Sequence, residues 1–176
     1  MNVRVNLLAI FVLSICSTSA HAQFDTVINL PENPDSPNPS QFSGNSIGFN
    51  TGISSSNTQL NVSDGGSVGS FFSAGTANGS NTNIEVNISG GTVGSGFDAN
   101  SGSMVNISDG TFGNNFDANS GSMVNISDGT FGNNFNANSG STVNISGGDV
   151  GNGFDVEDGS TVNISGGTFG LSLIHI

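Results

Sequence analysis

Residues 105–123 read V-N-I-S-D-G-T-F-G-N-N-F-D-A-N-S-G-S-M, and residues 124–142 repeat this stretch with changes only at positions 136 and 142. The repetition continues in both directions along the chain. A degenerate copy begins at Asn61, and its step of 26 residues to Asn87 is longer than the usual step. The regular copies carry an Asn-Ile-Ser triplet every 19 residues, at Asn87, Asn106, Asn125, Asn144 and Asn163. A fixed period of about 20 residues with Gly-rich corners is typical of a solenoid.

The pattern inside one unit predicts short strands separated by tight corners. Val105 and Ile107 alternate with Asn106, so their side chains share one face of a strand. Asp109-Gly110 suits a tight turn with positive φ, and residues 119–122 mark a second corner. Units stacked about 4.8 Å apart would place like residues above one another. The expected apolar ladders are Val105/Val124/Val143/Val162, Ile88/Ile107/Ile126/Ile145/Ile164, Phe97/Phe116/Phe135/Phe154, Ala99/Ala118/Ala137/Val156 and Val93/Phe112/Phe131/Val150/Phe169.

The sequence therefore predicts an all-β fold, a parallel β-helix (β-solenoid) of about five to six 19-residue coils with a Pro-rich N-terminal extension. A second interpretation stays open at this point. Ser-Asp-Gly-Thr between alternating apolar residues is also a signal for a two-residue hairpin, so the units could form an antiparallel array. The near-identity of successive units favours parallel stacking, because each residue then lies on its own counterpart.

The chain outside the repeats divides into three segments. Residues 1–22 have the layout of a signal peptide, with Arg4, an apolar stretch at 7–15 and an A-x-A site ending at Ala22. Cys16 leaves a lipoprotein signal as an alternative. Residues 23–57 are rich in Pro, Ser and Asn and are expected to form a linker or an N-terminal cap, with a first strand at 24–30. The repeats occupy residues 58–170. Residues 171–176 (LSLIHI) do not follow the repeat pattern, and we expect them to be a non-native tail or, alternatively, a hydrophobic capping strand.

The charge balance excludes several classes of partner. The chain has 13 acidic residues and a single Lys or Arg, which gives a formal net charge of −12. Nucleic-acid binding needs Lys and Arg to displace counterions from phosphates, so no nucleic-acid partner is expected. An anionic membrane surface is excluded for the same reason. The signal peptide indicates a secreted or cell-surface protein after cleavage at Ala22, and the partners that remain are cell-surface or matrix components.

The residues left after cleavage offer little for catalysis. His175 is the remaining His, and no Cys, Lys, Arg or Tyr follows Ala22. A Ser-His-Asp triad, a Cys nucleophile, a zinc cluster and a Lys Schiff base are therefore unavailable. A pair of carboxylates spaced as in retaining glycosidases is conceivable, but the Trp and Tyr residues that usually stack on sugars are absent. We expect no enzyme and no cofactor.

Calcium is the best-supported chemical alternative. Asp98, Asp117 and Asp155 occupy one repeat position, with Asn136 in the remaining copy, and carboxylate oxygens are the ligands that Ca²⁺ prefers. Asp109 and Asp128, at the first corner, are a second candidate set. The RTX nonapeptide G-G-x-G-x-D-x-U-x does not fit in register, because Val93 stands where its third Gly belongs.

The Asn-Ile-Ser and Asn-Val-Ser triplets also match the glycosylation sequon, as does Asn78-Gly79-Ser80. Because six of these seven matches come from one repeated motif, their number says little about glycosylation. We expect instead that the repeated Asn side chains point outward and stack on one another.

Two short motifs give the unit a family resemblance. The sequences Gly90-Gly91-Thr92-Val93 and Phe97-Asp98-Ala99-Asn100 resemble the GG-[small]-[apolar] and F-x-x-N repeats of polymorphic outer-membrane proteins and autotransporter-type adhesins. The whole unit is similar to repeats of large secreted bacterial β-helix proteins, over about residues 60–170. This resemblance implies an extracellular or cell-surface β-helix and no particular chemistry. The expected function is a non-catalytic structural spacer or adhesin-like module, with a calcium- or glycan-binding β-solenoid module as the alternative.

Overall fold

The computed structural model describes residues 24–30, 46–48 and 50–170. The expected signal peptide, residues 23, 31–45 and 49 of the expected Pro-rich segment, and the expected tail at 171–176 lie outside these residues. Every regular element within them is a β-strand, and the strands form a parallel β-solenoid of about six turns. Because the described part has no long apolar helix, it offers no helical membrane span. The predicted all-β parallel β-helix is therefore confirmed.

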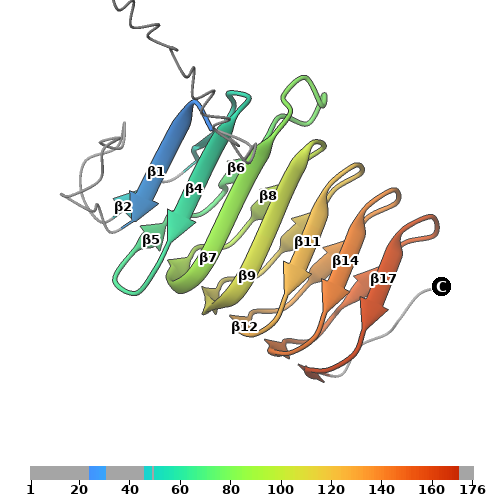
Figure 1. Cartoon of the computed structure of the whole chain (residues 1–176). Helices are drawn as coiled ribbons and strands as arrows, with labels where there is room; N and C mark the ends of the chain where they lie inside the picture. The colour runs from blue at the N-terminus through green and yellow to red at the C-terminus, as the bar shows by residue number, and fades with distance from the viewer. Residues whose placement is uncertain (1–23, 31–45, 49, 171–176) are drawn as a thin grey trace, which may run out of the picture.

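Each coil contributes up to three short strands, and equivalent strands stack into rows along the solenoid (Figure 1). The first row carries the Val-Asn-Ile segments: β1 (Thr26–Leu30), β4 (Thr58–Val62), β7 (Ile84–Val93), β9 (Ser103–Phe112), β11 (Met123–Ile126), β14 (Thr142–Ile145) and β17 (Thr161–Ile164). The second row consists of β2 (Ser46–Ile47), β5 (Ser67–Val68), β12 (Thr130–Phe131), β15 (Asp149–Val150) and β18 (Thr168–Phe169), together with the C-terminal ends of β7 and β9.

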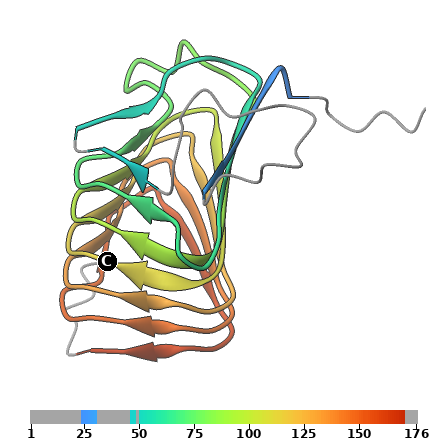
Figure 2. The ribbon, with the colours of Figure 1, turned by 90° about the vertical axis from the view of Figure 1, so that its left-hand side faces the viewer.

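The third row forms a separate sheet of six strands: β3 (Gly52–Ile53), β6 (Ser73–Ala74), β8 (Phe97–Ala99), β10 (Phe116–Ala118), β13 (Phe135–Ala137) and β16 (Asp155–Val156). The first two rows belong to one sheet of 12 strands, because β7 and β9 run through both rows. Figure 2 shows the coils lying one above another along this stack.

All strand pairs in the described residues are parallel, and like residues pair with like. Val124 pairs with Val105 on one side and with Val143 on the other, and Phe116 pairs with Phe97 and Phe135. An antiparallel array would pair each strand with its sequence neighbour across a hairpin. The hairpin interpretation is thus wrong for this part of the chain, and the expected stacking of like on like is confirmed.

The core is a narrow column of side chains inside the coils. The predicted Val, Ile, Phe and Ala ladders are buried as far as Phe154, and Val105, Val124 and Val143 are fully buried. At the C-terminal end of the described stack Val156, Val162 and Phe169 are only partly buried, and Ile164 is 49 % exposed. The rings of one row stack directly, with centroids 4.9 Å apart for Phe97 and Phe116 and 4.7 Å apart for Phe116 and Phe135. Each coil alone would leave these groups in water, so the stack is stabilised by contact between neighbouring coils.

The N-terminal segment also contributes to the solenoid. Strand β1 pairs in parallel with β4, so that Asn29 lies beside Asn61. Strands β2 and β3 pair with β5 and β6. The strand expected at 24–30 is therefore present as Thr26–Leu30, and it forms the first rung of the first row.

Candidate functional site

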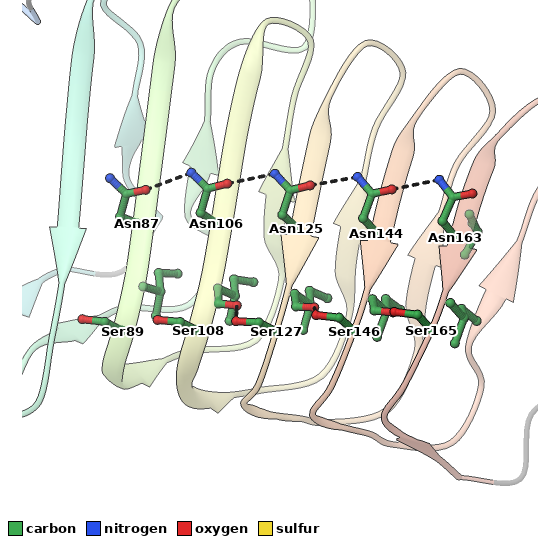
Figure 3. Close-up of a pocket in the computed structure, with 16 residues that line it drawn as sticks. Asn87, Ser89, Asn106, Ser108, Asn125, Ser127, Asn144, Ser146, Asn163 and Ser165 are labelled. Carbon is green, nitrogen blue, oxygen red and sulfur yellow. Dashed lines mark hydrogen bonds between the residues drawn. The ribbon is translucent and has the colours of Figure 1, made fainter. Parts of the chain in front are cut away.

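A continuous ladder of Asn side chains runs along the outer face of the first row (Figure 3). Asn106 lies between the buried Val105 and Ile107, and strand alternation therefore turns its side chain outward. The side-chain amide of each Asn donates to the amide oxygen of the Asn in the preceding coil. The pairs are Asn61 to Asn29 (2.9 Å), Asn87 to Asn61 (3.0 Å), Asn106 to Asn87 (3.0 Å), Asn125 to Asn106 (2.9 Å), Asn144 to Asn125 (2.8 Å) and Asn163 to Asn144 (2.9 Å).

This ladder confirms the expected outward stacking of the repeated Asn residues. An amide inside the ladder uses one N–H and one lone pair of its oxygen along the ladder. Asn61 and Asn87 also donate to Gln59 Oε1 (3.2 Å) and Glu85 Oε1 (2.6 Å) of their own coils. The side chains from Asn29 to Asn144 are half-buried between their neighbours, and Asn163 in the last described coil is exposed. From Asn106 onward the face consequently presents a regular series of oriented side-chain amides, one per coil.

A row of Ser side chains runs parallel to the Asn ladder, two residues further along each coil (Figure 3). Ser127 Oγ donates to the Ile107 carbonyl of the preceding coil at 3.3 Å, and Ser146 Oγ donates to the Ile126 carbonyl at 3.2 Å. The two rows enclose a shallow groove of about 610 Å³ that extends from Asn87 to Ser165. These Ser residues were not among the predicted site residues, although their fixed place after Ile in the regular copies was a signal for a second polar row.

The chemistry of this groove favours contact over catalysis. The described residues contain no His, Cys, Lys or Arg. A Ser hydroxyl is a weak nucleophile unless a neighbouring base accepts its proton, and here the hydroxyls donate to backbone carbonyls. The groove can therefore hold water or a polar partner through amides and hydroxyls.

The three calcium candidates lie on the outer face of the third row. Asp98 pairs directly with Asp117, whereas Asn136 stands between Asp117 and Asp155. Asn136 Nδ2 donates to Asp117 Oδ1 at 2.6 Å, which occupies one of the oxygens that a cation would use. Among the residues that the structure describes, no group of three His, Cys, Asp or Glu side chains is placed to hold a metal ion.

Asp98 is the carboxyl group with the clearest electrostatic perturbation. Its burial raises its pKa above the ordinary value, and the neighbouring charge of Asp117 raises it further. Hydrogen bonds with Asn119 and Ser73 act in the opposite direction, because they stabilise the charged form. The carboxylates of Asp98 and Asp117, which lie in adjacent rungs, therefore repel each other.

The corner carboxylates serve the turn itself. Asp109 Oδ1 accepts the backbone N–H of Gly110 at 2.6 Å, and Asp128 Oδ1 accepts that of Gly129 at 2.8 Å. Such local bonds from Asp to the following backbone are typical of turns. This second set of calcium candidates therefore has a structural role at the first corner.

Comparison with known proteins gives no match, because no protein family, no curated protein and no solved structure is similar enough to this chain to be matched.

Proposed function

We propose that this chain is a secreted, non-catalytic β-solenoid of a bacterial cell surface, acting as a structural spacer with an adhesin-like outer face. The observation that carries the proposal is the uninterrupted Asn ladder from Asn29 to Asn163. Along this face the ladder repeats the same side-chain amide in every coil, and so no single coil stands out there as a reaction centre. A stack of identical rungs gains length at a constant rate per repeat, which is the property that a spacer needs.

The extracellular setting is supported by the sequence of residues 1–22 and by the repeat motifs. The resemblance to polymorphic outer-membrane proteins and autotransporter-type adhesins supports the same setting. The partners that we propose are cell-surface or matrix components. The strongly acidic composition fits a surface that stays soluble and repels anionic membranes and nucleic acids.

The proposal is tested by expressing the full chain in a bacterial host and locating it by fractionation. N-terminal sequencing of the exported protein is expected to begin at Gln23. Retention of the uncleaved chain in the cytosol would contradict the extracellular role.

A calcium-binding module is the second candidate. Its specific support is the direct pairing of Asp98 with Asp117, which brings two carboxylates together in adjacent rungs. Calcium would relieve their repulsion and stabilise the coil stack. The comparison of calcium with sodium described in the Discussion separates this candidate from the spacer.

A further inference from the structure

Two exposed methionines lie side by side on the outer face of the first row. Met104 is 41 % exposed and Met123 is 39 % exposed, and strand register pairs them in adjacent coils. Each is followed by a fully buried Val, so strand alternation turns its own side chain outward. The two residues are therefore neighbours across one rung, about 4.8 Å apart along the solenoid, and neither contributes to the core.

These methionines interrupt a column of side chains that is otherwise polar from Gln59 onward. Strand register places one residue of each coil in this column: Gln59, Glu85, Met104, Met123, Thr142 and Thr161. The column runs beside the Asn ladder, two residues earlier in each coil. Because both methionines stay exposed, core packing does not account for an apolar residue type in this column.

The first two members of the column support the Asn ladder. Gln59 Oε1 accepts from Asn61 Nδ2 at 3.2 Å, and Glu85 Oε1 accepts from Asn87 Nδ2 at 2.6 Å. In both coils an oxygen at the ε position of the side chain thus lies within reach of the ladder amide two residues later. Each of these amides also donates along the ladder, so a second N–H is available for the bond within the coil.

The next two coils carry sulfur where this oxygen would be needed. Met104 and Met123 have a thioether, whose sulfur is a weak acceptor. Asn106 and Asn125 still donate to the preceding Asn at 3.0 and 2.9 Å, and that bond uses one N–H of each amide. An oxygen bound to the Met sulfur would stand at the ε position of the side chain, as the acceptor oxygens of the two earlier coils do.

The sulfur atoms of these methionines are open to oxidation. Residues 23–176 contain no Cys, Trp or Tyr, and Met104 and Met123 are the two methionines among them. When hydrogen peroxide reacts with an exposed thioether, a sulfur lone pair attacks one peroxide oxygen, the O–O bond breaks, and a sulfoxide and water form. The sulfur loses two electrons and the peroxide gains them. Because both side chains point outward, the added oxygen does not enter the apolar core.

We propose that Met104 and Met123 form a surface oxidation site, at which peroxide converts both thioethers to sulfoxides and each new oxygen accepts the second N–H of the ladder Asn two residues later. Oxidation then strengthens the outer face, whereas oxidation of a buried Met disrupts packing. Methionine sulfoxide reductases, one for each sulfoxide epimer, restore the thioether. This site goes beyond the spacer proposal and does not depend on it.

The test treats the full chain with hydrogen peroxide and follows both modification and melting. Peptide mapping by mass spectrometry is expected to find one added oxygen on Met104 and one on Met123. The melting midpoint should then rise by about 2–4 °C, the shift expected when two further hydrogen bonds form in a chain of this size. Treatment with both methionine sulfoxide reductases should return the midpoint to its starting value.

Two double variants separate the new hydrogen bonds from other effects of peroxide. Met104→Gln/Met123→Gln supplies the residue type of Gln59, so it should raise the midpoint without peroxide and abolish the response to peroxide. Met104→Leu/Met123→Leu is the matched control, because Leu is apolar, similar in volume to Met and without a sulfur atom to oxidise. The Leu variant should melt as the untreated parent does and should not respond to peroxide.

Sulfoxide formation with an unchanged or lowered midpoint would overturn the proposal, because the new oxygens would then make no bond to the ladder. Resistance of both methionines to peroxide would also overturn it. An equal rise in the Leu variant would do the same, by placing the effect elsewhere in the chain. Export of the chain and the length of the solenoid do not depend on this site, so these results leave the spacer proposal to its own tests.

Discussion

Asn125 donates from its side-chain amide to the Asn106 oxygen of the preceding coil at 2.9 Å, and its own oxygen accepts from Asn144 at 2.8 Å. One residue thus links three successive coils on the outside, while the neighbouring Val124 links the same coils on the inside. The outer polar ladder and the inner apolar ladder are formed by residues that are adjacent in the sequence. This arrangement lets a chain of low apolar content hold a regular stack.

Removing a central member of the Asn ladder should destabilise the stack. Asn125→Ala breaks two side-chain hydrogen bonds, and we expect a loss of about 1–3 kcal/mol in the free energy of unfolding. Asn163→Ala, in the last described coil, breaks only the bond to Asn144 and should cost less. Urea unfolding followed by circular dichroism measures both. Equal losses for the two variants would show that the ladder is not a source of stability.

The stacked Phe rings should contribute more than the polar ladder. Phe116 is buried and contacts rings above and below, so Phe116→Ala should cost about 3–5 kcal/mol. Phe169→Ala serves as a control, because Phe169 is only partly buried in the last described coil and should cost less. Thermal melting of both variants provides the comparison. An unchanged midpoint for Phe116→Ala would contradict its inward position.

The raised pKa of Asp98 gives stability a definite dependence on pH. Because the pKa is higher in the folded state than the ordinary value of 3.8, the folded state binds a proton more readily than the unfolded state. Ionised Asp98 therefore destabilises the fold at neutral pH, and the contribution of this group should improve as pH falls through its folded pKa. Below the ordinary value the improvement is complete.

Asp98→Asn removes this titration. Melting curves across mildly acidic pH should show a rise of the midpoint for the parent that is smaller in the variant. A parent and a variant with the same pH profile would show that Asp98 does not contribute to it.

The carboxylates as a group should make stability depend on salt. Two exposed charges about 5 Å apart in water repel by roughly 0.8 kcal/mol, and salt screens them with a Debye length of about 10 Å at 0.1 M. We expect sodium chloride to raise the melting midpoint from low ionic strength upward. No stabilisation by salt would contradict the repulsion between the rungs.

Calcium distinguishes the spacer from the calcium module. For the spacer, calcium at matched ionic strength should stabilise little more than sodium does. A large additional rise that Asp117→Asn diminishes would instead establish the calcium module. Asp149→Asn is the matched control, since Asp149 lies in the second row and outside the candidate set.

Much of this structure could be predicted because each repeat carries the same information. The alternation of Val105, Asn106 and Ile107 determines which side chains face inward, and the period of the repeat determines which residues meet. Register follows from stacking like on like, so the ladders could be stated residue by residue. The pairing of Asp98 with Asp117 follows from the same period.

Two other features could not be predicted: where each strand ends and how deeply individual side chains are buried. Both depend on how the backbone curves within a coil, which the repeat pattern does not specify. Residues 105–112 and 124–131 have the same sequence, yet the first stretch lies within the continuous strand β9 and the second is divided between β11 and β12. The partial burial of Asp98 depends on residues that lie beside it in the fold but far from it in the sequence, such as Ser73 and Asn119. Phe71 and Phe72 are adjacent in the sequence, yet Phe72 is buried whereas Phe71 is exposed and has a φ of 59°.

The spacer that we propose is a solenoid whose length grows by one rung for each repeat. The direct test is small-angle X-ray scattering of the full chain and of a variant with four extra copies of residues 105–123 inserted after position 123. We expect the longest dimension of the variant to exceed that of the parent by about 19 Å, at about 4.8 Å per copy, while the cross-sectional radius stays the same. An increase in the cross-section, or growth of all dimensions together, would contradict it.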